Sequence, residues 1–309
     1  MKVLFVCSGR NPSSVSPIVR SQGESLQKCG IEIDYFIIKG RGFTGYLKSI
    51  IPLRKEICKT EPEIIHAHYS LCGMVAAFAS RKPVVASLMG SDVMAHRLMI
   101  YILRFFSEYF WKVTIVKSKS MKEQISLNHA YIIPNGVDLS FFKQLDQSEC
   151  KKRVGFNPSR KQIVFLADPS RHEKNYELAF NAFQALREKF DDTIELKVIY
   201  GVEHQQILYY INAADVMLLT SKWEGSPNVI KESMACNVPI VSTRVGDVEE
   251  MISSTKGCFL AESSSKDVSD KLALALAFKG RTDGRNNISH LDSKLVASSI
   301  ISIYEKVTG

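Results

Sequence analysis

The sequence is most informative at residues 221–232, which read SKWEGSPNVIKE. An apolar run that suits a β-strand precedes this stretch at 215–220, and a second one follows it at 238–243. This order predicts a strand, a polar turn, a helix that begins near Pro227 and another strand, which together form a βαβ unit. Open α/β sheets bind ligands beyond the carboxyl ends of their strands. The stretch therefore predicts a ligand site at the turn between the first strand and the helix.

Two glutamates, Glu224 and Glu232, stand eight positions apart in this stretch. Glu224 falls in the predicted turn, beside the helix N-terminus at Pro227 and Asn228, and Glu232 falls inside the helix. The alternative is an ordinary surface turn with two solvated acids. The flanking strands and the turn residues favour a ligand site over this alternative.

A second polar cluster, ADPSRHEKN at residues 167–175, follows a predicted strand and precedes a predicted helix. Arg171 and Lys174 suit an anion, because their cationic groups supply charge and a helix N-terminus supplies free N–H donors. The alternative is a solvated loop in which the two cations balance Asp168 and Glu173. Because this loop ends at the same sheet edge as Glu224, we expect a diphosphate site there.

Both halves of the chain alternate predicted strands with predicted helices. Strands are expected at 2–7, 33–38, 64–67, 84–88, 112–116 and 131–133, and again at 162–166, 195–199, 216–219, 240–243 and 257–260. Helices are expected at 15–28, 47–59, 73–79, 96–110 and 120–127, and again at 177–189, 204–212, 228–236, 248–252 and 268–278. Such alternation predicts an α/β fold with doubly wound, largely parallel sheets.

The length of 309 residues favours two domains. We expect two Rossmann-like domains that face each other across a cleft, one at 1–143 and one at 161–309. The stretch 144–160 is polar and charged, and we interpret it as a linker with one short helix. The last helix of the C-terminal domain is free in this interpretation to pack back on the N-terminal domain.

The net charge of +8 is concentrated in the first half of the chain, where residues 1–145 hold 19 Lys and Arg against 10 Asp and Glu. This excess points to an anionic membrane surface or to anionic substrates. Nucleic acid is the weakest partner class, because neither zinc-finger spacing nor an RNA-binding aromatic signature is present. The seven cysteines form no C-x-x-C pair, which favours a reducing compartment over a disulfide framework. No run of about 18 uncharged apolar residues is available to span a membrane.

The predicted helix at 97–111 is apolar on nearly every side. A helix of this kind is usually buried, and we expect it in the core. The basic first half supports an alternative, in which the helix docks peripherally on anionic lipid.

Several motifs together resemble the retaining glycosyltransferases of family 4. The resemblance is carried by the run from Asn212 to Gly246, which includes both glutamates, and by the motif IPNGVD at 133–138. The basic loop at 168–175 and the motifs IIHAH at 64–68 and GSDV at 90–93 resemble further landmarks of that family. These landmarks extend over residues 64–246.

This resemblance implies a GT-B fold and transfer of a sugar from a UDP- or GDP-sugar with retention, without a metal or another cofactor. It implies that Glu224 contacts hydroxyls of the transferred sugar and that Glu232 accepts hydrogen bonds from the ribose. It also implies that Arg171 and Lys174 neutralise the departing diphosphate. Further donor contacts are expected at Gly225, Ser226, Pro227, Asn228, Val229, Gly201 and Val202, and acceptor-side or sugar-side contacts at Gly9, Arg10 and Asp92.

The chain departs from the family pattern at three places. The loop at 8–14 has one glycine where many relatives have several, and Met89 stands where many have histidine. Asp168-Pro169 replaces the usual Gly-Arg pair of the basic loop. These departures leave the sugar-side partner in the N-terminal domain unassigned and make the role of Arg171 less secure than that of Lys174.

The sequence favours a transferase over three other kinds of protein. A nucleotide-sugar epimerase of the same fold needs an acid/base pair, and we identify none. A non-catalytic nucleotide-sugar-binding module is disfavoured because the glutamates and the basic loop are intact, and a dehydrogenase would show G-x-G-x-x-G after the first strand. His66 and His68 alternate on one strand face, as zinc ligands can, but lack a third ligand at a suitable spacing. We therefore expect a metal-independent glycosyltransferase of cell-surface polysaccharide synthesis, cytoplasmic and peripheral to the inner membrane face, with a glycan or lipid-linked acceptor.

Overall fold

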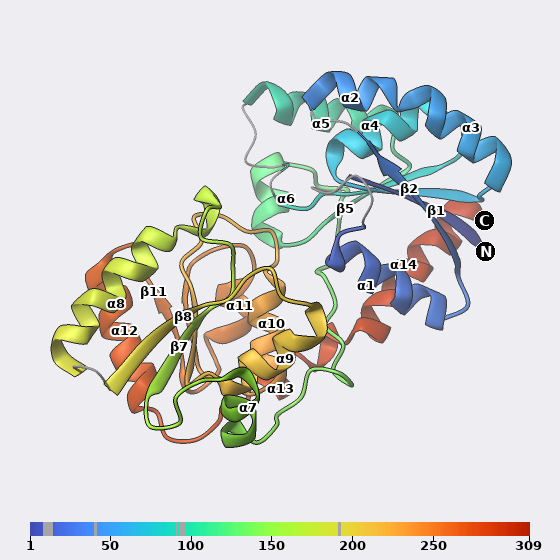
Figure 1. Ribbon diagram of the computed structural model, residues 1–309. Helices are drawn as coiled ribbons and strands as arrows, with labels where there is room; N and C mark the ends of the chain where they lie inside the picture. The colour runs from blue at the N-terminus through green and yellow to red at the C-terminus, as the bar shows by residue number, and fades with distance from the viewer. Residues whose placement is uncertain (9–14, 40–41, 91, 93–96, 191–192) are drawn as a thin grey trace. The chain divides into compact units, whose positions relative to one another are not determined.

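The computed structural model describes residues 1–309 except 9–14, 40–41, 91, 93–96 and 191–192. The described chain forms two compact units (Figure 1). Unit 1 comprises Met1–Gly136 and Ser293–Gly309, and unit 2 comprises Val137–Asp292. Each unit is a parallel sheet with helices on both faces, so the expected pair of Rossmann-like α/β domains is confirmed.

The sheet of unit 1 has six strands in the order β2-β1-β3-β4-β5-β6, and all paired neighbours run parallel. Its strands are β1 (Lys2–Ser8), β2 (Glu32–Ile38), β3 (Ile64–His68), β4 (Val84–Ser87), β5 (Val113–Val116) and β6 (Tyr131–Ile132). The side chains of β1 from Val3 to Cys7 are almost fully buried. Helices cover both faces of such a sheet, which is why the strand reads as a continuous apolar run rather than an alternating one.

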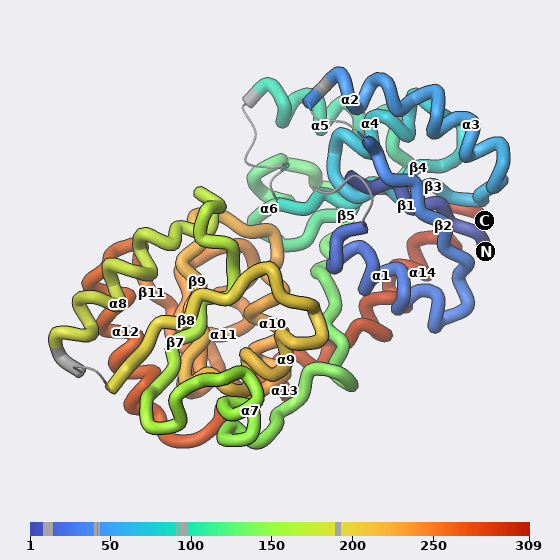
Figure 2. Tube along the Cα trace, viewed as in Figure 1, coloured from blue at the N-terminus to red at the C-terminus, as the bar shows by residue number. Residues whose placement is uncertain are grey.

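Two apolar clusters lie on opposite faces of this sheet, and the helices divide between them (Figure 2). The first face is covered by α1 (Pro17–Lys28) and α14 (Ser293–Thr308). The second face is covered by α2 (Gly42–Lys48), α3 (Ile50–Thr60), α4 (Ser70–Ala79), α5 (Arg97–Tyr109) and α6 (Lys119–Ile125).

The single helix expected at 47–59 is instead two helices, α2 and α3, which meet at Ser49. The Ser49 side chain donates to the carbonyl of Gly45 at 2.9 Å, and its N–H donates to the carbonyl of Tyr46 at 3.0 Å. The hydroxyl thus takes the carbonyl that the next turn of a continuous helix would use, as local serine side chains can do.

The last helix packs on unit 1, as the sequence interpretation allowed, whereas the expected linker is part of unit 2. Helix α14 belongs to unit 1, where it packs against α1 and buries Tyr304. The expected linker at 144–160 belongs to unit 2, where α7 (Gln147–Val154) packs against α9 (His204–Ala213). The ammonium of Lys151 on α7 is buried and lies 2.8 Å from a carboxylate oxygen of Asp215.

The sheet of unit 2 has five parallel strands in the order β11-β10-β9-β7-β8. Its strands are β7 (Lys161–Phe165), β8 (Ile194–Val198), β9 (Val216–Leu219), β10 (Ile240–Thr243) and β11 (Cys258–Ala261). Helices α8 (Tyr176–Phe190) and α12 (Ser265–Ala277) cover one face, and α7, α9, α10 (Asn228–Ala235), α11 (Val248–Ile252) and α13 (Gly284–Asn287) cover the other.

The order of the strands in unit 2 fixes where a ligand can bind. The chain runs from β7 to its neighbour β8 on one side and then to β9 on the other side. The loops that follow β7 and β9 consequently diverge at the carboxyl edge of the sheet, which is the topological switch point of this unit. Open α/β sheets bind their ligands in the crevice at this point.

The expectation that the helix at 97–111 is buried in the core is wrong for one of its sides. Leu103, Phe106 and Trp111 are buried, but Tyr101, Phe105 and Tyr109 on the other side of α5 are exposed. Helix α5 lies in the outer helical layer of unit 1, so only one of its faces has a sheet to pack against (Figure 1). Within the described residues, no helix has the length and apolar content that a bilayer crossing requires.

Candidate active site

Lys174 and Glu224 meet at the switch point of unit 2. Lys174 ends η1 (His172–Lys174), the short helix in the loop after β7, and Glu224 lies in the loop after β9. The Lys174 Nζ lies 2.5 Å from Oε1 of Glu224, and the Ser221 hydroxyl donates to the same oxygen at 2.8 Å. Both charged side chains are partly buried. The structure thus places a cation and a carboxylate together where a ligand of this fold binds.

Hydrogen bonds tie together the loops that follow β7, β9 and β10. The Thr220 hydroxyl lies within 3.2 Å of the carbonyl of Lys174 and 3.0 Å of that of Asn175. The Thr243 hydroxyl, at the end of β10, donates to the carbonyl of Ser221 at 2.7 Å. Both threonines are buried, so these bonds form away from water, where a polar group without a partner is costly. The loops therefore hold Lys174 and Glu224 in place before any ligand arrives.

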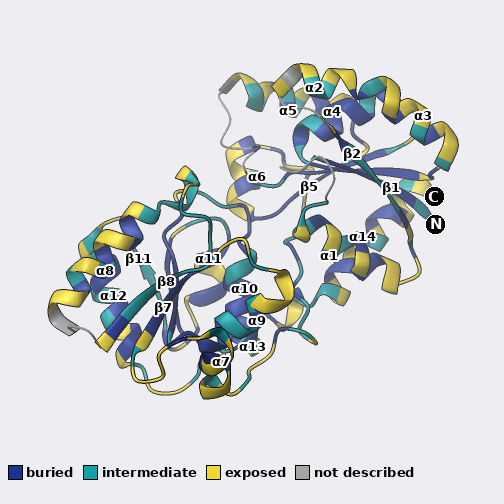
Figure 3. Ribbon diagram, viewed as in Figure 1, coloured by how far each residue is buried: buried dark blue, intermediate teal, exposed yellow. Residues whose placement is uncertain are grey.

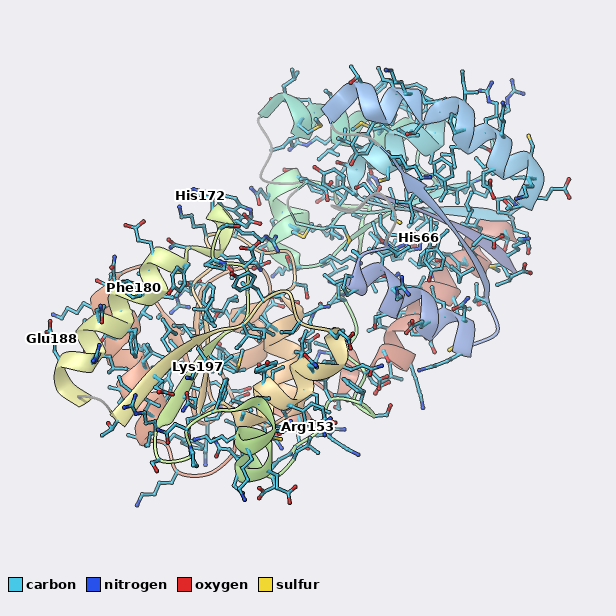
Figure 4. All side chains as sticks on the ribbon, in the orientation of Figure 1. His66, Arg153, His172, Phe180, Glu188 and Lys197 are labelled. Carbon is cyan, nitrogen blue, oxygen red and sulfur yellow. The ribbon has the colours of Figure 1, made fainter. Side chains whose placement is uncertain are left out.

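Arg171 lies in the same basic loop but does not reach Glu224. Its Nε and Nη2 contact Oε1 of Glu173 at 2.7 and 2.5 Å. The neighbouring Lys222 donates its backbone N–H to the carbonyl of Glu173, and its ammonium lies 2.8 Å from Nε2 of His172 (Figure 4 labels His172 on this loop). The alternative expected from sequence, in which Arg171 balances Glu173, describes this arrangement.

Helix α10 begins at Asn228 directly after the glutamate turn. Pro227 at its N-cap position provides no side-chain cap for the first N–H groups. A helix N-terminus of this kind presents free donors and a positive dipole end to an anion. Among the described residues, the buried Oδ1 of Asn228 also has no hydrogen-bond partner. Gly225, Ser226 and the first turn of α10 through Val229 follow Glu224 directly in the chain.

A buried charge network that the sequence analysis missed supports this turn. The ammonium of Lys231 on α10 contacts the hydroxyl of Ser226, which in turn contacts Oδ2 of Asp247. Lys231 is fully buried, and burial lowers its pKa to about 8, whereas burial raises the pKa of Asp247. In the sequence, a sign of this network is that Lys231 lies between Ile230 and Glu232 on a short helix. The structure shows that most residues of this helix are buried.

Gly246 permits the close approach of two loops in this network. Its φ is +57°, and a Cβ at this position would lie 2.6 Å from the carbonyl oxygen of Gly225. A side chain there would therefore meet backbone and push the glutamate turn away. The glycine allows residues 246–247 to pack directly against the turn.

Glu232 lies inside α10 and is almost completely buried. Its Oε1 is 3.5 Å from Nε2 of His204, the first residue of α9. The loop of Gly201 and Val202 leads directly into His204, and Gly201 has a positive φ of 69°. The structure thus brings the loop after β8 next to Glu232, through a histidine that the sequence analysis did not single out.

The acceptor-side or sugar-side residues expected in unit 1 are Gly9, Arg10 and Asp92. Gly9 and Arg10 lie outside the described residues. Asp92 is buried, and its two carboxylate oxygens accept the N–H groups of Ser70 at 2.7 Å and Met89 at 2.5 Å. Burial raises the pKa of Asp92 despite these bonds. The residue connects the loops that follow β3 and β4 at the carboxyl edge of the sheet.

His66 and His68 are buried in unit 1 with their rings stacked at 4.4 Å. His66 Nδ1 lies 2.5 Å from the hydroxyl of Tyr304, and its Nε2 lies 2.8 Å from that of Ser87. Burial lowers the pKa of both histidines, to about 3 for His66. Across the described part of the chain, no three His, Cys, Asp or Glu side chains are grouped as they would be to hold a metal ion. Both histidines belong to the core as neutral rings, but among the described residues only His66 has hydrogen-bond partners, and neither ring nitrogen of His68 has one.

Comparison with known proteins adds two family matches. Residues 3–141 match the model described as Glycosyltransferase Family 4, and residues 193–289 match the one described as Glycosyl transferases group 1. The chain is 26% identical over 88% of its length to TuaC of Bacillus subtilis (strain 168), a provisionally assigned teichuronic acid biosynthesis glycosyltransferase, of which the match covers 88%.

Two solved structures are similar over nearly the whole chain. A sucrose-phosphate synthase from Thermosynechococcus elongatus has a TM-score of 0.81 at 15% identity, and the match covers 99% of this chain and 98% of that one. Anabaena Alr3699/HepE in complex with UDP and glucose has a TM-score of 0.74 at 16% identity, with 99% and 100% covered. At these identities the likeness establishes the fold, which is the GT-B fold expected from sequence.

Proposed function

We propose that this chain, a GT-B glycosyltransferase of the family 4 and group 1 type, transfers a sugar with retention of configuration from a nucleotide sugar to a hydroxyl of a glycan or lipid-linked acceptor. The observation that carries the proposal is the contact of Lys174 with Glu224 at the switch point of unit 2, beside the free N-terminus of α10. A nucleotide sugar needs a cationic site for its diphosphate and a carboxylate for its sugar hydroxyls. This site has both.

The donor fits along α10. We assign the diphosphate to the Lys174 ammonium and the N–H groups at the start of α10, and the sugar hydroxyls to Glu224. Glu232 lies four residues into the helix from Asn228, which is about 6 Å along the axis at 1.5 Å per residue. Its buried carboxylate beside His204 then accepts hydrogen bonds from the ribose, with Gly201 and Val202 near the base.

The proposed chemistry follows from these groups. The bond between the anomeric carbon and the donor phosphate oxygen breaks, and negative charge grows on the diphosphate, which Lys174 stabilises. The sugar becomes oxocarbenium-like, and the nearby carboxylate of Glu224 stabilises it. The acceptor hydroxyl attacks from the face that the phosphate leaves, and its proton passes to the departing phosphate oxygen. This route needs no protein nucleophile, and we assign the positive charge to Lys174 rather than to a metal.

The proposal also covers the acceptor and the place in the cell where the enzyme acts. The role that the name of TuaC gives that protein, teichuronic acid biosynthesis, supports a cell-surface polysaccharide as the product. The UDP bound in the Anabaena structure makes UDP-sugars the first donors to test. We propose that the enzyme acts in the cytoplasm at the inner face of a membrane, with the acceptor bound by unit 1.

A panel of UDP- and GDP-sugars tests the function. Thermal shift identifies the donor, and release of nucleoside diphosphate is then measured with and without candidate acceptors. We expect release that depends on the acceptor and a product whose anomeric configuration, read by NMR, equals that of the donor. An inverted product would contradict retention, and conversion of the donor sugar without an acceptor would favour an epimerase. Failure of every nucleotide sugar to bind would contradict the proposal as a whole.

A further inference from the structure

Helix α5 of unit 1 carries an exposed aromatic stripe that the core does not explain. The stripe follows the helical spacing of residues 98, 101, 105 and 109, which places these side chains on one face. The exposed fractions are 70% for Leu98, 64% for Tyr101, 52% for Phe105, 72% for Tyr109, 41% for Phe110 and 49% for Phe78 on α4. We call these six residues the aromatic face.

Four rings of the aromatic face, those of Phe78, Phe105, Tyr109 and Phe110, form one connected cluster. Phe105 lies 5.2 Å from Tyr109 and 5.6 Å from Phe110 between ring centroids, and Phe110 lies 6.1 Å from Phe78. The cluster therefore bridges α4 and α5. Scattered exposed apolar residues are ordinary, but a contiguous patch of large side chains marks an interaction surface.

The same helical layer is exposed and apolar beyond α5. Leu47 on α2 and Ile51 on α3 are also large, exposed apolar residues, and both helices show much exposed surface (Figure 3). The aromatic face thus belongs to a broader apolar layer on one side of unit 1. Unit 2 has exposed apolar residues as well, such as Phe180 on α8 and Leu274 on α12.

Basic side chains dominate the charge of this layer. On α2 to α5 and the turns after α3 and α4, the described side chains include seven basic ones and four acidic ones, Glu56, Glu61, Glu63 and Glu108. The basic ones are Lys48, Arg54, Lys55, Lys59, Arg81, Lys82 and Arg104. Two of them lie directly at the aromatic face, because Arg54 donates to the carbonyl of Phe78 at 3.2 Å and Arg104 stacks over Tyr101 at 5.8 Å. The layer combines aromatic side chains with positive charge.

We propose that the aromatic face docks on an anionic lipid bilayer, with α5 lying in the headgroup region. Tyrosine suits this depth because its ring enters the apolar boundary while its hydroxyl stays hydrated, and phenylalanine and leucine add apolar area that can be buried there. Each nearby Lys or Arg adds attraction to anionic headgroups. A symmetric contact between two copies is disfavoured, because it would bring one basic layer against another. The inference rests on the proposed function in one respect, namely that docking brings unit 1 to a lipid-linked acceptor.

Sedimentation with lipid vesicles tests the docking without any donor or acceptor. We compare vesicles of phosphatidylcholine alone with vesicles that contain phosphatidylglycerol, at low and high salt. The test variant is Leu98→Ser/Phe105→Ser, which removes two exposed side chains and keeps the buried side of α5. The matched control is Phe180→Ser/Leu274→Ser, which removes two exposed apolar side chains from unit 2 (Figure 4 labels Phe180). Circular dichroism and thermal unfolding check that both variants are folded.

We expect the wild type to bind anionic vesicles and to lose binding as salt rises, because salt screens the charge. The Leu98→Ser/Phe105→Ser variant should bind at least about tenfold more weakly, and the unit 2 control should bind as the wild type does. Equal binding by the test variant and the wild type, or no preference for anionic vesicles, would overturn the proposal. A wild-type dimer that this variant converts to a monomer would also overturn it, in favour of a self-association surface. Nucleotide-sugar affinity should be unchanged in both variants, so failure of docking is separable from failure of the proposed function.

Discussion

Lys174 and Glu224 are 50 residues apart in the sequence and 2.5 Å apart in the structure. The contact joins the loop after β7 to the loop after β9, the two loops that diverge at the switch point of unit 2. Ser221 donates to the same carboxylate oxygen. The pair is therefore placed by the fold itself, and a donor that binds there must share the ammonium with the carboxylate.

The Lys174→Met variant should lose turnover more than donor affinity. In the proposed reaction the ammonium stabilises charge that grows only as the diphosphate departs, and loss of one such group typically lowers kcat by roughly 10²–10³. Steady-state kinetics with the accepted donor measures the effect. Lys222→Met is the matched control, because Lys222 lies on the neighbouring loop, pairs with His172 and should leave kcat within about twofold. Similar kcat values for both variants would remove Lys174 from the mechanism.

The Glu232→Ala variant should weaken donor binding with little change in kcat at saturation. Its carboxylate is assigned to the ribose, which does not change during the reaction, and a hydrogen bond to a charged group is worth about 1.5–3 kcal/mol. The expected loss of affinity is therefore roughly tenfold or more, measured by calorimetric titration. Glu188→Ala on α8 is the control and should bind the donor normally (Figure 4 labels Glu188).

Lys231 and Asp247 should behave as a coupled pair. Lys231→Met leaves the buried Asp247 without its cation, which typically costs about 3–5 kcal/mol of unfolding free energy. The double variant Lys231→Met/Asp247→Asn removes both charges and should recover at least half of that loss. Urea unfolding of the two single variants and the double variant measures the coupling. Additive losses would show that the pair does not act as a unit.

The stability of unit 1 should fall in mild acid because of His66 and His68. Burial, with a smaller effect from Lys117, lowers the pKa of His66 to about 3, whereas an unfolded histidine has a pKa near 6.5. Between these values only the unfolded chain protonates His66, so the unfolding free energy decreases as pH falls, by about 1.4 kcal/mol per pH unit, and the lowered pKa of His68 acts in the same direction. Folded stability from this source is complete above pH 6.5 and is lost towards pH 3.

Two variants separate the pH effect from the packing of the histidines. His68→Leu should reduce the loss of stability between pH 6 and pH 5 by about 1 kcal/mol. His66→Leu should reduce it similarly but also destabilise the protein at pH 7, because Ser87 and Tyr304 then lose a buried partner. The chain has two tryptophans, and Trp111 lies in unit 1, so its fluorescence in a Trp223→Phe background follows this unit alone. An unchanged pH slope in His68→Leu would argue against the buried neutral histidine.

The strands were predictable from sequence because burial on both faces makes each a continuous apolar run, as in Val3 to Cys7. The observed strand bounds lie within one or two residues of the expected ones. The break at Ser49 depends on one hydroxyl, and the placement of α14 depends on contacts such as Tyr304 with His66, 238 residues away. No local pattern reveals such contacts.

In the site, as in the fold, some features follow from local sequence and others depend on long-range contacts. Glu224 and Lys174 could be placed at one sheet edge from strand order alone. The pairing of Arg171 with Glu173 and the network of Lys231, Ser226 and Asp247 depend on how loops pack in three dimensions. The sequence did not point to His204, because this residue reaches Glu232 only through the packing of α9 against α10.

Calorimetric titration of a nucleotide sugar and of its nucleoside diphosphate tests the central claim most directly, namely that the switch point of unit 2 binds the donor. The measurement compares the wild type with Glu232→Ala and Glu188→Ala. The account predicts that Glu232→Ala weakens both ligands by roughly tenfold, since each contains the ribose, and that Glu188→Ala binds both normally. Wild-type affinity of the Glu232→Ala variant for both ligands would contradict the account.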